Sequence, residues 1–375
     1  MTAHALLSAS GSKRWLSCTP SAKLEATLPE QKRATGAFDF SQEGTMAHSL
    51  AEAKLRYYYN QIGIEEYQHE EAIIKATPYY NDDFEAHVDS YVLYVRSQIG
   101  EGDTPLFEQR VDFSDWVPDG FGTADVVILS KHSIRVIDLK FGKGIPVHAQ
   151  DNSQLRLYAL GAYAKFKDEY PDIKEVSYTI HQPRLDSIST DGTSIAKLVD
   201  WANYYVKPKA KKAWSGSGEF LPGEWCQFCR AKAQCRARSD YNTEIAKQEF
   251  KEPALLSEEE VSEVLTKAQD LRTWVNDVED FVLTRAVEQN IIPTGYQLAK
   301  TMTHRKISDH ALAATVLVEK GLPEEGIWEP RKLKSLAALE KINKQVPAYL
   351  GDLVMRPEGQ PKLVRAKESA KEDFL

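Results

Sequence analysis

Two aspartates, Asp125 and Asp138, flank a pair of apolar segments and are the residues of this chain best placed to do chemistry. Residues 126–129 and 134–137 have the apolar pattern of strands, and the Ser-Lys-His-Ser stretch at 130–133 is typical of a tight turn between them. A two-residue loop there would put Asp125 directly opposite Asp138, with their Cβ atoms about 5 Å apart on one face. Two carboxylates at that distance repel each other unless a proton or a cation lies between them. We therefore expect a divalent metal ion at this end of the hairpin, with Lys140 on the same face.

The four cysteines form a second candidate site. Cys226, Cys229 and Cys235 have the spacing C-x2-C-x5-C, and Cys18 is the remaining cysteine. Four sulfurs are enough for a tetrahedral zinc ion or for a 4Fe–4S cluster. Zinc sites usually group their ligands in two close pairs, so the remote Cys18 favours a structural iron–sulfur cluster that ties the N-terminal segment to the end of the core. Zinc stays open as an alternative, and so does a buried free thiol at Cys18 with no bound metal.

Three further groups of polar residues accompany these two sites. His48 lies in a predicted helix, where a neutral imidazole can bind a metal or serve as a structural histidine. Gln154 and Tyr158 are four residues apart and share one helix face. A lysine-rich stretch could contact nucleic-acid phosphates or be an ordinary solvated helix face; it consists of Lys207, Lys209, Lys211 and Lys212.

The composition sets limits on these hypotheses. With 375 residues, 42% of them hydrophobic, the chain can bury one sizeable core, with a second smaller unit. It has no long apolar run and no secretory start, so we expect a cytoplasmic protein without a membrane span, in which disulfides are not expected. A net charge of −8 does not fit a nonspecific DNA-coating protein, but metal-dependent nucleases also carry acidic sites.

These residues need an α/β scaffold, and the sequence pattern supplies one. Helices are predicted at 45–59 with Thr45 as N-cap, across 67–98, at 152–166 and at 195–214. Strands are predicted at 107–113 and 176–181, in addition to the hairpin. We expect one domain over residues 1–240 and a mostly helical region without a catalytic cluster over residues 241–375.

The order of these motifs resembles the RecB-type branch of the PD-(D/E)XK nucleases. His48, Asp125, the Asp138-x-Lys140 motif, Gln154-x3-Tyr158 and the four cysteines follow the arrangement of its iron–sulfur exonucleases, such as the AddB nuclease domain and the CRISPR-adaptation nucleases. That resemblance covers about residues 8–240, and the whole chain also resembles an uncharacterised family of phage and prophage proteins. The family often has glutamate where this chain has Asp138.

The resemblance implies a fold and a role for each matching residue. The fold would be a restriction-endonuclease-like core, a mixed sheet flanked by helices, with an iron–sulfur staple. Asp125, Asp138, His48 and the Leu139 carbonyl would bind Mg²⁺ or Mn²⁺, and Lys140 would orient or deprotonate the attacking water. Gln154 and Tyr158 would contact DNA and brace the site, and Glu108 would add a carboxylate beside the ligands.

The expected function is therefore a metal-dependent DNA exonuclease that acts on single strands or duplex ends in phage recombination, replication or repair. A phage single-strand annealing protein is one conceivable partner. The first alternative is a DNA-binding recombination partner that keeps the fold but cuts poorly or not at all. The second is a zinc-stapled structural protein of a phage particle.

Overall fold

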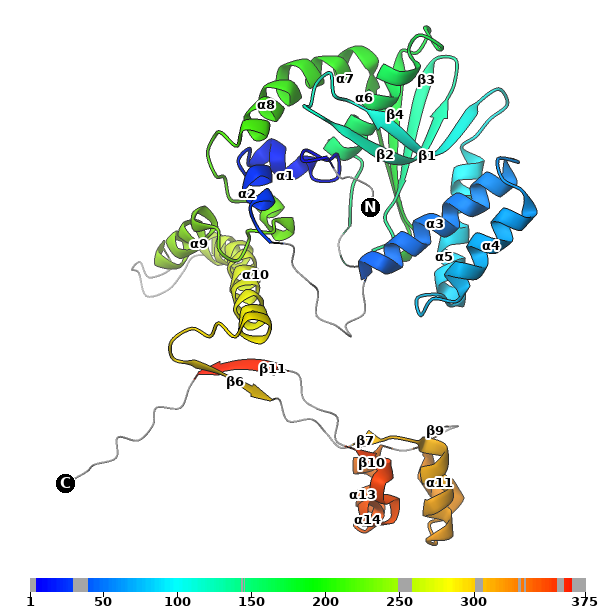
Figure 1. Cartoon of the computed structure of the whole chain (residues 1–375), viewed down its shortest axis with the longest axis vertical. Helices are drawn as coiled ribbons and strands as arrows, with labels where there is room; N and C mark the ends of the chain where they lie inside the picture. Colours follow the sequence, from blue (N-terminus) through cyan, green and yellow to red (C-terminus); the bar gives the residue numbers. More distant parts are fainter. Residues whose placement is uncertain are drawn as a thin grey trace, which may run out of the picture. The chain divides into compact units, whose positions relative to one another are not determined.

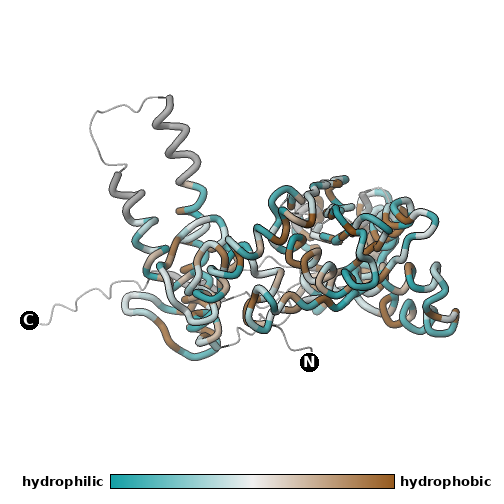
Figure 2. Tube along the Cα trace, turned by 90° about the horizontal axis from the view of Figure 1, so that it is seen from above, coloured by the Kyte–Doolittle hydropathy of each residue, from teal (hydrophilic) through white to brown (hydrophobic). Residues whose placement is uncertain are grey.

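The structure, a computed structural model, describes residues 5–29, 40–142, 144, 146–248, 258–300, 306–329, 332–333, 335–355 and 361–365. Two compact units make up the chain, Met1–Asp270 and Leu271–Leu375. All of the candidate site residues predicted from the sequence lie in the first unit. In the described part of the chain no helix is long and apolar enough to cross a membrane, and Figure 2 shows hydrophobic and hydrophilic residues interspersed along the trace.

A five-stranded sheet in the order β1-β2-β3-β4-β5 forms the centre of the first unit. Its strands are β1 (Thr104–Asp112), β2 (Phe121–Leu129), β3 (Ser133–Leu139), β4 (Glu175–Gln182) and β5 (Ser187–Ser194). All neighbouring strands are antiparallel except β3 and β4, which are parallel. Parallel neighbours need a crossover connection, and α6 (Ser153–Phe166) lies in the segment between them. The predicted mixed central sheet flanked by helices is thus confirmed.

Helices cover both faces of this sheet (Figure 1). One face packs against α3 (Phe40–Tyr58), α4 (Ile64–Lys75) and α5 (Asp82–Ser97), and the other packs against α6. Side chains along β2 alternate between the two resulting cores: Val126 and Ile128 belong to the core under α3–α5, whereas Val127 and Leu129 belong to the core under α6. Nearly continuous apolar strands are expected where both faces of a sheet are buried.

The core on the α6 face extends to the segments that carry the cysteines. It includes residues of α1 (Ser12–Ser17), α2 (Ser21–Ala26), α7 (Ile195–Trp201), the π-helical turn η2 (Ala202–Val206) and α8 (Lys207–Ser215). Both α1 and α2 contact α8. A short 3-10 helix, η3 (Glu224–Phe228), follows and contacts α1, and α9 (Arg236–Gln248) comes next. The first helices of this unit therefore lie beside the segment from α8 to η3.

The predicted hairpin has the register that its sequence indicates. The backbone N–H of Ser130 donates to the carbonyl of Ser133 at 2.9 Å, and the ladder continues to the pair Val126 and Ile137. The next residues in this register are Asp125 and Asp138. Lys131 and His132 therefore form the loop, as expected from the run of polar residues between two apolar segments.

Several predicted helix boundaries differ from the structure. Helix α3 begins at Phe40, so Thr45 is not an N-cap; its hydroxyl donates to the Ser41 carbonyl inside the helix, a bond that threonine makes readily there. The predicted helical region 67–98 is two helices, α4 and α5, because Pro78 lies between them and Asn81 caps α5. Strand β5 was not predicted, because Ile188 is the one apolar side chain among its polar residues and glycine.

Residues beyond α9 form further helices with short strands that the sequence pattern does not indicate. Helix α10 (Glu258–Gln289) contains the boundary between the two units. The second unit has its own apolar core, which includes Ala313, Leu317, Ile327 and Leu339. Its helices are α11 (His310–Glu319), α12 (Glu324–Ile327), α13 (Leu336–Ile342), α14 (Val346–Leu350) and the 3-10 turn η4 (Gly351–Leu353). Its paired strands are β6 (Tyr296–Lys300) with β11 (Pro361–Arg365), β7 (Lys306–Ile307) with β10 (Val354–Met355), and β8 (Trp328–Glu329) with β9 (Lys332–Leu333).

Candidate metal and catalytic site

The ladder between β1 and β2 is interrupted where Glu108 faces Asp125. Phe107 pairs with Val126 and Gln109 pairs with Ala124, but the pair between them is missing. Glu108 has a φ of 44°, in the left-handed region that is strained for a residue with a long side chain. Strain of this kind costs roughly 1–3 kcal/mol and is found most often at functional sites. The pairing of the strands therefore does not account for the positions of Glu108 and Asp125, which points to another role for these residues.

This irregularity changes the side-chain alternation along β2. Ala124 belongs to the core under α6 and Val126 to the core under α3–α5, although strict alternation would put both on one face. Strict alternation would also put Asp125 on the α6 face together with Asp138. Instead, the Asp125 carboxylate meets His48, which α3 brings from the opposite layer.

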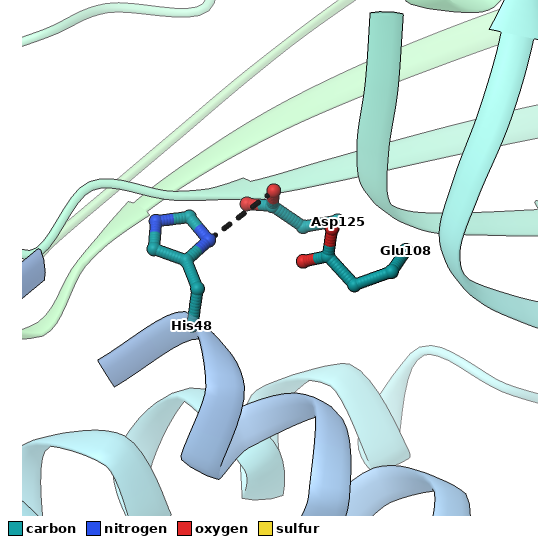
Figure 3. Close-up of side chains that lie close together, drawn as sticks. All are labelled: His48, Glu108 and Asp125. Carbon is teal, nitrogen blue, oxygen red and sulfur yellow. Dashed lines mark ion pairs between the residues drawn. The ribbon is translucent and has the colours of Figure 1, made fainter. Parts of the chain in front are cut away.

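His48, Glu108 and Asp125 form a compact group of potential metal ligands (Figure 3). One ligand atom from each lies within 4.8 Å of the others, and the three come from α3, β1 and β2. His48 Nδ1 lies 3.3 Å from Asp125 Oδ1, and the Leu139 backbone N–H donates to Asp125 Oδ2 at 2.7 Å. Imidazole and carboxylate are ligands that Mn²⁺ accepts, and Mg²⁺ favours the carboxylates. The group therefore fits a divalent cation by the chemistry of its donors.

A small cavity lies against this group. Besides the three potential ligands it is lined by residues of α3, α5, β2 and β3, namely Ala51, Glu52, Leu55, Tyr91, Val126 and Leu139. Leu139 thus borders the cavity, and the role of its carbonyl as a metal ligand stays a prediction.

Asp138 has a different set of partners on the α6 side. Its Oδ2 lies 2.8 Å from Lys140 Nζ, and its Oδ1 accepts a hydrogen bond from the Gln154 amide at 3.0 Å. The Gln154 side chain also accepts from Lys140 Nζ at 3.2 Å, and its Nε2 lies 3.2 Å from the Tyr158 hydroxyl. The predicted residues Asp138, Lys140, Gln154 and Tyr158 are therefore one connected network. Lys140 is held further by its backbone N–H, which donates to the His181 carbonyl of β4 at 2.9 Å.

The charges of His48, Glu108 and Asp125 change one another's pKa values. Burial alone would lower the pKa of His48, but the charge and the hydrogen bond of Asp125 outweigh it and raise that pKa to about 9. The same partner, His48⁺, keeps the pKa of Asp125 below its ordinary value despite burial. Burial and then the charge of Asp125 raise the pKa of Glu108 to about 7. His48 and Asp125 are therefore a charged pair at neutral pH, and the carboxyl group of Glu108 beside them is partly protonated.

In the network on the α6 side, the pKa values of Asp138 and Lys140 also differ from their ordinary values. Burial raises the pKa of Asp138, and the nearby charge of Asp125 adds to that effect. Burial would lower the pKa of Lys140, but the charge of Asp138 outweighs it and raises the pKa. Lys140 is thus an ammonium ion at neutral pH, suited to orient water or to stabilise negative charge.

Gly122 makes room for Tyr158 beside this network. A Cβ atom at Gly122 would lie 2.8 Å from Cε1 of the Tyr158 ring, closer than carbon atoms approach. Burial is the main reason that the pKa of Tyr158 lies above its ordinary value, so its hydroxyl stays protonated and can donate. The glycine at the start of the Gly-Thr-Ala-Asp sequence therefore has a packing role that the sequence alone does not reveal.

A buried ion pair connects the start of α3 to the β4–β5 connection. Arg184 Nη1 lies 2.7 Å from Glu43 Oε2, and both side chains are largely buried. The Arg184 guanidinium also lies over the Phe141 ring, 4.9 Å from its centroid. Glu43 precedes His48 by five residues on α3, so the pair fixes the end of the helix that carries the histidine. Nothing in the sequence pattern singles out these two residues, because their separation is 141 positions.

The four predicted cysteine ligands line one pocket. They come from the end of α1, from η3 and from the turns that follow it, and none is in a disulfide: Cys18, Cys226, Cys229 and Cys235. Burial raises the pKa of the Cys18 and Cys226 thiols and raises that of Cys229 to about 12. Without a metal these thiols are therefore protonated.

The spacing of the four sulfurs bears on the kind of metal centre. Tetrahedral zinc with Zn–S bonds of about 2.3 Å brings its sulfurs to about 3.8 Å from one another. Among all described residues, the group of His48, Glu108 and Asp125 is the only one with three potential ligand atoms within 4.8 Å, so no three cysteine sulfurs are that close. A 4Fe–4S cluster holds its sulfurs further apart, since each binds a different iron. The choice between zinc and an iron–sulfur cluster stays a prediction.

Comparison with known proteins gives a family match over almost the whole chain. A model of the family described as "Protein of unknown function (DUF2800)" matches residues 4–371. Among solved structures, one described as "Crystal structure of SSO0001" matches with 14% sequence identity, and the match covers 58% of this chain and 94% of that chain. The TM-score of that match is 0.23, which is too low to support an argument about fold or function.

Proposed function

The chain belongs to the DUF2800 family, and we propose that it is a metal-dependent DNA exonuclease with a PD-(D/E)XK type of active site. The observation that carries the proposal is the meeting of His48, Glu108 and Asp125 beside the network of Asp138 and Lys140. These residues belong to the motifs that resemble RecB-type nucleases, with Glu108 in addition.

The donor set of His48, Glu108 and Asp125 fits Mn²⁺ or Mg²⁺. Asp138, which follows Ile137 opposite Asp125 in the register of β2 and β3, is a further carboxylate nearby. A cation bound there would lower the pKa of a bound water molecule and neutralise charge on the scissile phosphate. Glu108 counts as a ligand in this proposal rather than a carboxylate beside the ligands. The repulsion among the buried carboxylates supports a cation, because its charge would lower the pKa of Glu108 and Asp138 to their ordinary range.

The remaining residues bind and orient the substrate. The Lys140 ammonium, held by Asp138 and Gln154, is positioned to hold a water molecule and to stabilise charge at the phosphate. Gln154 connects Lys140, Asp138 and Tyr158, so its amide keeps the three groups in fixed relative positions. The protonated Tyr158 hydroxyl can donate to a phosphate oxygen.

For the cysteines we propose a 4Fe–4S cluster of structural function. Four sulfurs in one pocket, with no three of them within 4.8 Å of one another, support this assignment over zinc. Protein purified without air should be brown, with about four iron atoms per chain, whereas zinc protein is colourless. Zinc in a colourless protein would contradict the cluster.

The test of the nuclease uses anaerobically purified full-length protein, Mn²⁺ and DNA labelled at either end, both single-stranded and double-stranded. Wild-type protein should shorten the DNA from an end, and EDTA should stop the reaction. Lys140→Ala should lower the rate by about 100-fold or more, as expected for the loss of a charged group at the reacting phosphate. Lys131→Ala, in the exposed hairpin loop, is the matched control. A folded wild-type protein that leaves all of these substrates intact would contradict the proposal and favour a DNA-binding role.

A further inference from the structure

The helical segment from α7 to α8 exposes two neighbouring tyrosines. Tyr204 is 81% exposed and Tyr205 is 43% exposed. Both lie in the π-helical turn η2, in which the Lys207 N–H donates to the Ala202 carbonyl five residues earlier. Pro208 explains the wider turn, because it has no N–H to donate to the Tyr204 carbonyl four residues before it. Turns of this kind occur frequently at functional sites.

Tyr205 belongs to a row of alternating aromatic and cationic side chains. The Arg156 guanidinium lies 5.6 Å from the centroid of the Trp201 ring, and that ring stacks on Tyr205 with a centroid distance of 6.4 Å. Lys209 Nζ lies 4.3 Å above the Tyr205 ring and bonds to its hydroxyl at 3.1 Å. The row begins on α6, the helix that also carries Gln154 and Tyr158, and continues along α7, η2 and α8. Figure 1 shows α6, α7 and α8.

The charge of this segment is opposite to that of the chain. Residues 201–218 contain four lysines and no aspartate or glutamate, although the chain as a whole has a net charge of −8. Lys207, Lys211 and Lys212 are exposed, and Lys209 is half-buried against Tyr205. Four positive charges in a stretch without an acidic residue, beside exposed aromatic rings, attract a polyanion that also has flat apolar groups.

We propose that this surface, defined by Tyr204, Tyr205 and the four lysines of α8, binds single-stranded DNA. A base stacks on the more exposed ring of Tyr204, Tyr205 extends this aromatic surface beside Trp201, and the lysines contact the phosphates. A duplex would use the lysines alone, because its bases are already stacked on each other and present no free faces. The inference rests on the proposed function only in taking DNA as the nucleic acid, since binding through this surface does not require the metal site.

Binding of a fluorescent 20-nucleotide oligo-dT to the full-length protein in EDTA tests the proposal without cleavage. The double variant Tyr204→Ala/Tyr205→Ala should weaken single-strand binding by about tenfold or more and leave duplex binding nearly unchanged. The matched control is Tyr57→Ala/Tyr58→Ala, which removes two neighbouring tyrosines exposed by 40% and 51% on α3. Phenylalanine at positions 204 and 205 should restore single-strand binding, because it keeps the rings.

The contribution of the four lysines can be measured separately, from the salt dependence of DNA binding. Changing all four to glutamine should weaken both single-strand and duplex binding and reduce the slope of log K against log salt by about 0.7 per lost phosphate contact on the single strand. A control variant with glutamine at four exposed lysines elsewhere, positions 131, 165, 167 and 174, removes the same charge from other surfaces.

Three outcomes would overturn the surface proposal: no single-strand binding by the wild type, normal binding by both surface variants, or equal losses in surface and control variants. Loss with the lysine variant alone would also overturn the stacking role and leave a nonspecific cationic face. The two proposals can be tested separately, because oligonucleotide binding is measured in EDTA with the surface variants, whereas cleavage is measured with Mn²⁺ and Lys140→Ala. Binding through the surface by a wild type that does not cut would contradict only the nuclease.

Discussion

Glu108 and Asp125 face each other across β1 and β2 at the position where the ladder between these strands is interrupted, and their carboxylates meet His48 there. Neither residue could take this position in a regular ladder, since its side chain would follow the alternation of its neighbours. The positive φ of Glu108 is the local distortion that accompanies the arrangement. A metal site would explain why the backbone is strained where three potential ligands meet.

Replacing Glu108 with glutamine should weaken Mn²⁺ binding, because the amide keeps the size of the side chain and loses its negative charge. A loss of about 10-fold or more in affinity is expected, at least as large as for a residue that only orients a ligand, measured by isothermal titration calorimetry. Glu175→Gln, at the exposed start of β4, is the control and should bind normally. Wild-type affinity in Glu108→Gln would remove Glu108 from the ligand set.

The metal-free protein should lose stability as the pH rises from 7 to about 10. The pKa of His48 is about 9 in the folded protein against an ordinary value of 6.5, so protonated His48 stabilises the fold fully below pH 6.5. That stabilisation disappears as the pH rises through 9. Urea unfolding in EDTA at several pH values measures the effect, and His48→Gln should show a flatter profile over this range. Identical profiles for the two proteins would contradict the ion pair with Asp125.

Mn²⁺ affinity should change with pH in the opposite direction. A metal ion binds the deprotonated ligands, so affinity should rise with pH through about 7, where Glu108 loses its proton, and again toward 9, where His48 does. Calorimetry in buffers of different ionisation enthalpy should detect the protons released on binding. Affinity that does not depend on pH from 6 to 9 would mean that neither residue binds the metal.

Gly122→Ala should destabilise the protein by displacing Tyr158, since the added methyl group would lie 2.8 Å from the ring. Overpacking of this kind typically costs about 1–3 kcal/mol. In a Tyr158→Ala background the same glycine substitution should cost much less, because the clashing ring is gone. Urea unfolding of the two single variants and the double variant gives the coupling energy. Simple additivity would show that Gly122 does not pack on Tyr158 as described.

Breaking the ion pair of Glu43 and Arg184 should disturb both stability and metal binding. Arg184→Met leaves the buried Glu43 carboxylate without its partner, which costs about 3–5 kcal/mol for pairs of this kind. Changing both residues, Glu43→Leu with Arg184→Met, removes the unpaired charge and should recover most of the stability. Mn²⁺ affinity should follow the position of α3, so it should fall in the single variant and partly recover in the double variant. Unchanged affinity in a destabilised single variant would confine the pair to a structural role.

Serine in place of any one of the four cysteines should have the same result, even at Cys18, which is more than 200 positions from the others. Each variant should lose the iron–sulfur absorbance and become more sensitive to limited proteolysis in the segment that contains α1 and α2. Ser17→Ala, next to Cys18, is the control and should keep both properties. A Cys18→Ser variant with a full complement of iron would show that the N-terminal segment does not belong to the centre.

The sequence determined the elements of the first unit well wherever local patterns decide them. The apolar runs around residues 130–133 predicted the hairpin and its register, and the 3.6-residue pattern with Asn152 predicted α6. Prediction failed where local signals mislead: Thr45 has the chemistry of a cap but lies within α3, and β5 is too polar to be recognised as a strand. Pro78 indicates the break between α4 and α5, but the prediction followed the periodic pattern and placed one helical region there.

For the site, the chain by itself specified which residues have suitable chemistry, because residue type and spacing within one hairpin or one helix turn are local properties. Asp138, Lys140, Gln154 and Tyr158 belong to this class, and so do three of the four cysteines. Only the tertiary structure decided that Asp125 meets His48 and Glu108, that Cys18 reaches the other cysteines, and that Glu43 pairs with Arg184. These contacts join separate layers and distant segments, and they depend on packing, on one strained residue in β1 and on the twist of the sheet, none of which has a periodic signature in the sequence.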